Sequence, residues 1–133
     1  MNLLLLSPGF PGEMPHFTRG VAQTGARVIG LGDLPASMLP DLAKSNLADY
    51  VHVQSMWDEQ HVVQQLQSMQ HQLRIDRVEC AWEPGMVLAA RIREGLGLPG
   101  MTVAQTIPFR DKGAMTNVLD AAGVRTPRHH RAA

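Results

Sequence analysis

Residues 95–129 read GLGLPGMTVAQTIPFRDKGAMTNVLDAAGVRTPRH, and the order of turns, apolar residues and helix signals in this stretch decides how the chain is divided. The first part predicts a Gly/Pro turn followed by a short strand at residues 101–103. The second part has the spacing of an amphipathic helix at Met115, Val118, Leu119 and Ala122. Asp111 is the natural N-cap of this helix, and Gly123 ends it with Pro127 beyond.

Lys112 falls in the first turn of that helix, where a positive charge opposes the helix dipole. A phosphate in front of the helix would make this position favourable, because backbone N–H groups and the dipole both attract anions there. The alternative is a lysine that is simply solvated. The residue by itself leaves both interpretations open.

The rest of the chain alternates apolar runs with helix-like stretches. Strands are expected at residues 3–6, 27–31, 50–53, 78–82 and 101–103. Helices are expected at residues 14–25, 41–45, 58–73 and 86–94. Such alternation predicts a three-layer α/β sandwich with a mostly parallel, Rossmann-like sheet of about five strands.

Apolar stripes predict which helix side chains face the sheet. In the first helix, Phe17 and Val21 are expected to point inward, together with Ala22. In the helix at residues 86–94, the apolar residues are expected inside and the charged residues, including Arg93, outside.

Composition excludes several classes of protein. The 133 residues suffice for one domain, and twelve basic residues balance twelve acidic ones, which argues against a nucleic-acid surface. The apolar run MNLLLL ends at Ser7 after four leucines, too short for a signal peptide or a membrane span. One cysteine, Cys80, excludes an internal disulfide and suits a cytoplasmic protein, where a buried, inert thiol is expected.

Ligands of parallel α/β sheets gather at the carboxyl ends of the strands, so the loop at residues 7–13 is a candidate binding site. Gly9 and Gly12 allow the backbone to come close to a ligand, and Glu13 precedes the following helix. Asp33 ends the second strand, where a ribose-binding acid would lie in a dinucleotide fold. However, SPGFPG is not GxGxxG, and Pro11 removes a backbone donor, so a plain turn is the alternative.

The histidines do not predict a metal site. His61 and His71 are ten residues apart on one expected helix, about 15 Å along its axis, which is too far to share an ion. His129 and His130 are adjacent near the end of the chain, so their side chains point in different directions.

Three motifs carry a resemblance to a known family: LGLPG at residues 96–100, RDKxxM at 110–115 and LxxAGVxTP at 119–127. Together they resemble the junction between the N-terminal and central domains of the ATP-grasp superfamily, closely over residues 75–129 and loosely before. The resemblance implies a Rossmann-like pre-ATP-grasp domain at residues 1–104. Residues 105–133 would then be a connecting helix and the start of a missing ATP-grasp domain.

The same resemblance implies roles for individual residues. Lys112 matches the lysine that reaches the nucleotide phosphates, and Arg110 is expected to contact phosphate as well, with solvation as its alternative. Glu83 follows the fourth strand at the position of an acidic residue that shapes the acceptor or nucleotide edge of the cleft. An exposed strand-end carboxylate is the alternative for Glu83.

The activity that the resemblance implies is ATP-dependent ligation, in which ATP phosphorylates a small carboxylic acid and an amine or similar nucleophile attacks the acyl phosphate. ATP and Mg²⁺ would serve the full-length enzyme, with the metal ligands beyond Ala133, so this chain is expected to be an inactive N-terminal fragment. Two alternatives stay open. One is a stand-alone nucleotide or small-molecule binding module that uses the glycine loop, and the other is a non-catalytic interaction domain, with a homodimer through the last helix as one possibility.

Overall fold

The computed structural model describes residues 1–130 and 132 and has a four-stranded parallel sheet in the order β3-β2-β1-β4. The strands are β1 (Asn2–Leu6), β2 (Arg27–Gly32), β3 (Asp49–His52) and β4 (Arg77–Glu79). β1 is central because it pairs with both β2 and β4, so Leu4 lies opposite Ile29 on one side and Val78 on the other. The predicted parallel α/β fold is confirmed, with four strands in place of the expected five.

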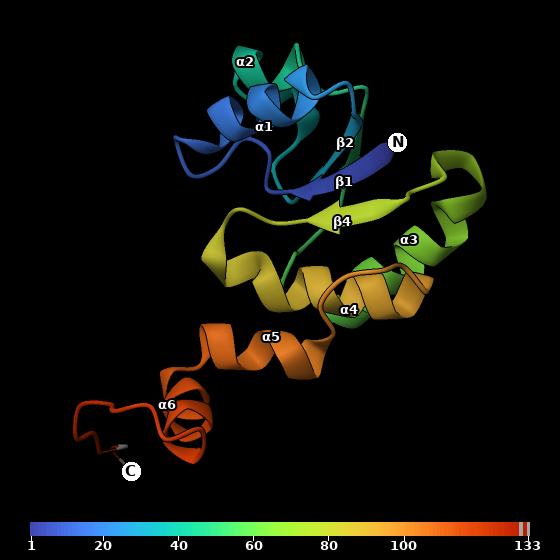
Figure 1. The fold of residues 1–133 in the computed structure, drawn as a ribbon. Helices are drawn as coiled ribbons and strands as arrows, with labels where there is room; N and C mark the ends of the chain where they lie inside the picture. The colour runs from blue at the N-terminus through green and yellow to red at the C-terminus, as the bar shows by residue number, and fades with distance from the viewer. Residues whose placement is uncertain (131, 133) are drawn as a thin grey trace.

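Helices cover both faces of this sheet, which gives the three predicted layers (Figure 1). One face carries α1 (Met14–Gln23) and α2 (Asp41–Lys44), and the other carries α3 (Glu59–Leu73) and α4 (Met86–Leu96). Single 3₁₀ turns lie at Ala36–Met38 and Glu83–Gly85. The last two helices are α5 (Val103–Arg110) and α6 (Lys112–Ala121), and they extend away from the sheet (Figure 1).

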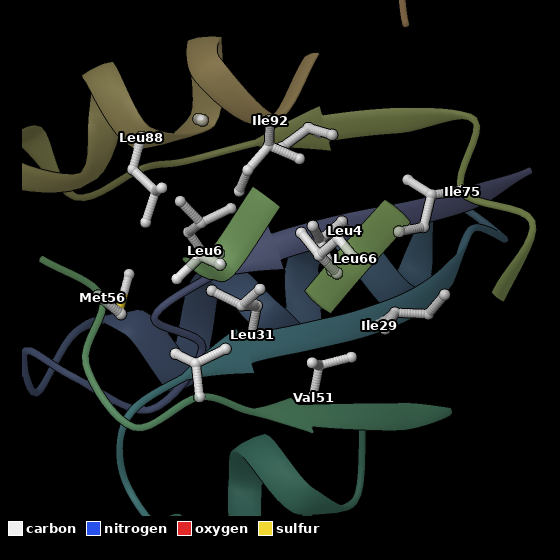
Figure 2. Packing of buried hydrophobic residues seen from close by; sticks show 14 of the residues in the cluster. Leu4, Leu6, Ile29, Leu31, Val51, Met56, Leu66, Ile75, Leu88 and Ile92 are labelled. Carbon is white, nitrogen blue, oxygen red and sulfur yellow. The ribbon is translucent and has the colours of Figure 1, made fainter. Parts of the chain in front are cut away.

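The core lies on both sides of β1, as a continuous apolar strand requires. Leu4 and Leu6 point toward α3 and α4, where they join Leu66 and Ile92 in the larger cluster (Figure 2). Leu3 and Leu5 point to the opposite face, with Val28 and the partly buried Val21, Ala22, Ala26 and Leu47. Because successive strand residues alternate in direction, the four leucines fill both layers.

The prediction of a strand at residues 101–103 is wrong, because α5 begins there. Thr102 is instead the N-cap of α5: its hydroxyl accepts a hydrogen bond from the Gln105 backbone N–H at 3.2 Å, and the Gln105 side chain accepts one from the Thr102 backbone N–H at 3.0 Å. This reciprocal pair is a capping box, which begins a helix and leaves no strand. Pro108 lies inside α5, near its end.

Two predicted helix faces also need correction. Phe17 is 50% exposed, and Thr18 is buried in its place because its hydroxyl donates to the carbonyls of Pro8 and Met14. Arg93 was expected outside but is 9% exposed. Its guanidinium donates to the carbonyl oxygens of Met101 at 2.9 Å and Val78 at 2.8 Å, so it fastens the turn after α4 to β4.

Gly100 is required by this arrangement. Its φ of +135° is unfavourable for other residues, and a Cβ there would lie 2.5 Å from Arg93 Cδ. The LGLPG motif therefore ends α4 and makes room for the buried arginine.

Within the described residues, no helix has the length and apolar character needed to cross a membrane.

Candidate functional site

A cavity of about 390 Å³ opens at the carboxyl edge of the sheet. Its walls come from the ends of the strands and the loops that follow them: residues 7–10, 32–34, 39, 50, 56–57 and 82. We call this the edge pocket. Its position agrees with the rule that parallel α/β sheets bind ligands beyond the carboxyl ends of their strands.

The loop after β1 forms one wall in a fixed conformation. Ser7 has a φ of +52°, which is uncommon outside glycine, and its backbone N–H donates to Leu31 O at 2.7 Å. The Ser7 hydroxyl donates to Phe10 O. Gly9 lies so close to the segment before α2 that a Cβ would be 2.9 Å from side-chain atoms of Leu39 and Pro40. The loop is thus closed onto the sheet and onto this segment.

Of the three loop residues that the sequence singled out, the structure places one in the edge pocket. Gly9 lines it. Gly12 has open space around its Cα, and Glu13 lies with His16 and Phe17 on the outer side of α1. Glu13 is the N-cap of α1, but its side chain makes no capping hydrogen bond.

Three aromatic side chains cluster in the wall of the edge pocket: Phe10 from the loop after β1, with Trp57 and Trp82. The ring centroids of Phe10 and Trp82 are 5.9 Å apart in an edge-to-face arrangement, and those of Trp57 and Trp82 are 5.8 Å apart. Trp57 is 65% exposed and Phe10 is 56% exposed. Large aromatic rings left open to solvent beside a cavity are a feature of ligand sites.

Besides Ser7, Asp33 and Tyr50 supply the polar side chains of the pocket wall. Asp33 Oδ2 accepts a hydrogen bond from the Met56 backbone N–H at 3.4 Å, and the Tyr50 hydroxyl donates to Leu34 O at 2.7 Å. Burial, and then the negative charge of Asp33, raise the pKa of Tyr50 to about 12. The phenol therefore stays neutral next to the carboxylate.

Glu83 and Arg110 are brought together, although they are far apart in sequence. Arg110 Nη1 lies 3.2 Å from Glu83 Oε1, and both side chains are exposed, at 45% and 63%. Such a pair contributes little to stability.

Lys112 is exposed at the first position of α6, and its ammonium makes no ion pair with any residue between 1 and 130. Asp111 caps α6 as predicted, accepting a hydrogen bond from the Ala114 N–H at 2.9 Å.

Cys80 lies directly after β4. This strand was expected to continue to Trp82, but it ends at Glu79. Its thiol donates to Trp82 O at 3.0 Å, and burial raises its pKa, so the protonated form is favoured. Among the described residues, no three His, Cys, Asp or Glu side chains lie close enough together to hold a metal ion.

Sequence reasoning missed the aromatic wall of the edge pocket. The chain has six aromatic residues, and four of them, Phe10, Tyr50, Trp57 and Trp82, line this cavity. The sequence did carry a signal for this wall: aromatic residues are few in the chain, and these four lie in strands or in the loops that follow strands.

Fold and motifs together define a Rossmann-like domain of the pre-ATP-grasp class. The family model of the ATP-grasp N-terminal domain matches residues 22–100, which is more than half of the chain, and the chain belongs to this family. No curated protein sequence matches it.

Solved structures resemble the chain over nearly its whole length. The L-amino acid ligase from Bacillus licheniformis is 22% identical, with a TM-score of 0.76 over 95% of this chain. The phosphoribosylglycinamide synthetase from Anaerococcus prevotii is 21% identical, with a TM-score of 0.72 over 97% of this chain. The chain spans 30% of the length of each of these two proteins.

Proposed function

We propose that this chain is the N-terminal part of an ATP-dependent ligase, in which ATP phosphorylates a carboxylate and an amine attacks the resulting acyl phosphate. The observation that carries the proposal is the match of residues 22–100 to the ATP-grasp N-terminal domain. Two similar solved structures, an L-amino acid ligase and a phosphoribosylglycinamide synthetase, support it by their names and by their greater length.

In this proposal residues 1–104 form the Rossmann-like domain, and residues 105–133 lead into an ATP-grasp domain that completes the enzyme. α5 crosses this boundary, so the connection begins within a helix. An apolar groove of about 550 Å³ between α5 and α6 supports the proposal, because its walls include Phe109 and Val118, which are 65% and 55% exposed. The remainder of the parent would cover this groove, with a homodimer as the competing arrangement.

Lys112 and Arg110 are the proposed phosphate contacts. Lys112 fits that role because its ammonium is exposed at the N-terminus of α6, where helix N–H groups also favour an anion. For Mg²⁺ the described residues do not fit, since they contain no cluster of carboxylate or histidine ligands. The metal ligands of the parent therefore belong to its other domains in this proposal, and Glu83 remains the proposed acidic residue at the acceptor edge.

The test is Lys112→Ala in the full-length parent, measured by ADP release and by nucleotide affinity. Losing one charged hydrogen bond to phosphate should cost about 1.5 to 3 kcal/mol, or roughly ten- to a hundredfold in kcat/KM or Kd. Lys44→Ala is the matched control, because Lys44 is the other lysine of the chain and its ammonium bonds Ser37 O, away from α6. Equal activity of the two variants would remove Lys112 from the site.

The 133-residue chain itself should show no ATPase activity and at most millimolar affinity for Mg-ATP. One exposed lysine in water gives little net binding without the other phosphate ligands. Calorimetry decides this point, and micromolar binding that Lys112→Ala leaves unchanged would overturn both the role of Lys112 and the fragment interpretation.

A stand-alone small-molecule binding module is the second candidate. The edge pocket favours it, because its described walls come entirely from this chain. Binding of a small molecule by the isolated chain would be compatible with both functions, and ligase activity of a longer parent would distinguish them.

A further inference from the structure

The charge of the edge pocket limits the ligands that it can hold. Asp33 is the single side chain among its described lining residues that is charged at neutral pH. A phosphate or carboxylate ligand would lie beside this carboxylate with no arginine or lysine in the wall to offset the repulsion. Tyr50 does not supply a free donor either, since its hydroxyl is already bonded to Leu34 O.

The loop after β1 does not make up for this lack of cations. Pro8 and Pro11 have no N–H, and the Ser7 N–H is already bonded to Leu31 O. The N-cap of α1 is Glu13, an exposed acid, so the helix end that follows the loop also carries negative charge. Gly9 and Phe10 keep backbone N–H groups in the pocket wall, but no positively charged side chain of the described lining stands beside them, so the loop is a weaker anion site than a glycine-rich loop without prolines.

The remaining wall suits an apolar body with a positive charge. Phe10, Trp57 and Trp82 supply three clustered rings, and aromatic rings attract cations through their quadrupole. Leu39 and Met56 are buried side chains that supply apolar surface. Asp33 directly follows β2 and lines the pocket together with these groups.

We propose that the edge pocket binds a small molecule with a protonated amine attached to an aromatic or bulky apolar group. Its amine pairs with Asp33 and its apolar part packs on the rings. Within the proposed ligase, on which this assignment of a role rests, the molecule is the amine substrate. It binds as the ammonium and gives one proton to solvent; its nitrogen then forms a bond to the acyl carbon as the C–O bond to phosphate breaks, and the phosphate leaves with the second proton.

Binding is tested on the 133-residue chain with three probes of one shape: 2-phenylethylamine, 2-phenylethanol and 3-phenylpropionate. Trp57 and Trp82 are the two tryptophans of the chain and both line the pocket, so their fluorescence reports binding. The amine should bind about three- to tenfold more tightly than the alcohol at neutral pH, because an exposed ion pair and a cation–π contact each add modestly. The carboxylate should bind more weakly than the alcohol.

Two matched variants locate the charge. Asp33→Asn should reduce the preference for amine over alcohol to about twofold, the part that the cation–π contact supplies, and it keeps the oxygen that accepts from the Met56 N–H. Asp49→Asn removes the same charge at the start of β3, the opposite edge of the sheet, and should preserve the preference. Trp57→Ala should weaken the amine and the alcohol alike, and its exposed position predicts an intact fold, checked by circular dichroism.

Three results would overturn the proposal: no saturable binding of the amine, equal or tighter binding of 3-phenylpropionate, or an amine preference that Asp33→Asn leaves unchanged. None of these bears on ATP-dependent ligation, which is tested separately by ADP release in the full-length parent. A functional ligase whose N-terminal domain prefers the carboxylate would thus refute the pocket assignment and leave the proposed reaction standing.

Discussion

Arg93→Met should destabilise the fold by about 2 to 4 kcal/mol, because the substitution removes both hydrogen bonds of a buried guanidinium. These bonds join Arg93 to Val78 O at 2.8 Å and to Met101 O at 2.9 Å, and hydrogen bonds of charged groups are worth about 1.5 to 3 kcal/mol each. The sum is reduced because methionine also removes the desolvation penalty of the buried charge. Against a total stability of about 5 to 15 kcal/mol, the loss is large.

Urea denaturation followed by tryptophan fluorescence measures this change in the free energy of unfolding. Arg91→Met is the control: Arg91 is two residues away on α4 and pairs with Glu59 at the surface, with side chains 49% and 32% exposed, so its loss should cost at most about 1 kcal/mol. Amide exchange in α5 should also quicken in Arg93→Met, since the turn before it is released. A loss no larger than that of Arg91→Met would refute the structural role of Arg93.

Three further outcomes are expected. Gly100→Ala should destabilise the fold by about 1 to 3 kcal/mol, because Gly100 has a φ of +135° and a Cβ there would clash with Arg93. Gly97→Ala should cost less, since Gly97 has a φ of +65° and open space around it, and equal unfolding midpoints of the two variants in urea would contradict this. Tyr50, the single tyrosine, should titrate near pH 12, so the stability given by its neutral form is present below pH 10 and lost between pH 10 and 12. Asp33→Asn should lower that pKa in ultraviolet titration of the phenol, and an unchanged or higher value would argue against the coupling. Amides of α6, which has no buried residue, should exchange faster than those of β1, and equal protection would show that α6 is held more firmly than its packing indicates.

The fold could be predicted because its strands are marked by burial on both faces. Four leucines in a row at residues 3–6 leave no polar face, which is typical of a central parallel strand. The strand prediction at residues 101–103 failed because a triplet with two apolar residues, Met101 and Val103, cannot distinguish a strand from the first turn of a helix. Thr102 and Gln105 held the decisive signal, a capping box with glutamine at the third helical position.

Local patterns could not predict that Arg93 is buried. Helix periodicity placed Arg93 among charged, exposed neighbours, whereas its hydrogen-bond partners lie in β4 and in the turn after α4. The rule that ligands bind at the carboxyl ends of parallel strands predicted where the edge pocket lies. It did not predict which aromatic residues line the pocket. Its rings come from three separate loops, and no spacing in the sequence relates Phe10 to Trp57 or Trp82. Gly12 was chosen for its conformational freedom, and the structure leaves open space where its Cβ would stand and does not place it among the residues that line the edge pocket.

The edge pocket and the proposed phosphate contacts lie on one connected path. Trp82 lines the pocket, Glu83 follows it and pairs with Arg110, and Lys112 begins the next helix two residues later. The proposed ligase would need such an arrangement, because an amine can attack an acyl phosphate when the reacting groups are held close together. The pair between Glu83 and Arg110 is exposed and weak, so in this proposal it would exchange partners at little cost once a phosphate approached Arg110. The described part of the chain thus supplies a formed pocket, and in the proposed ligase the cations at the other end of this path would bind phosphate together with groups from the rest of the parent.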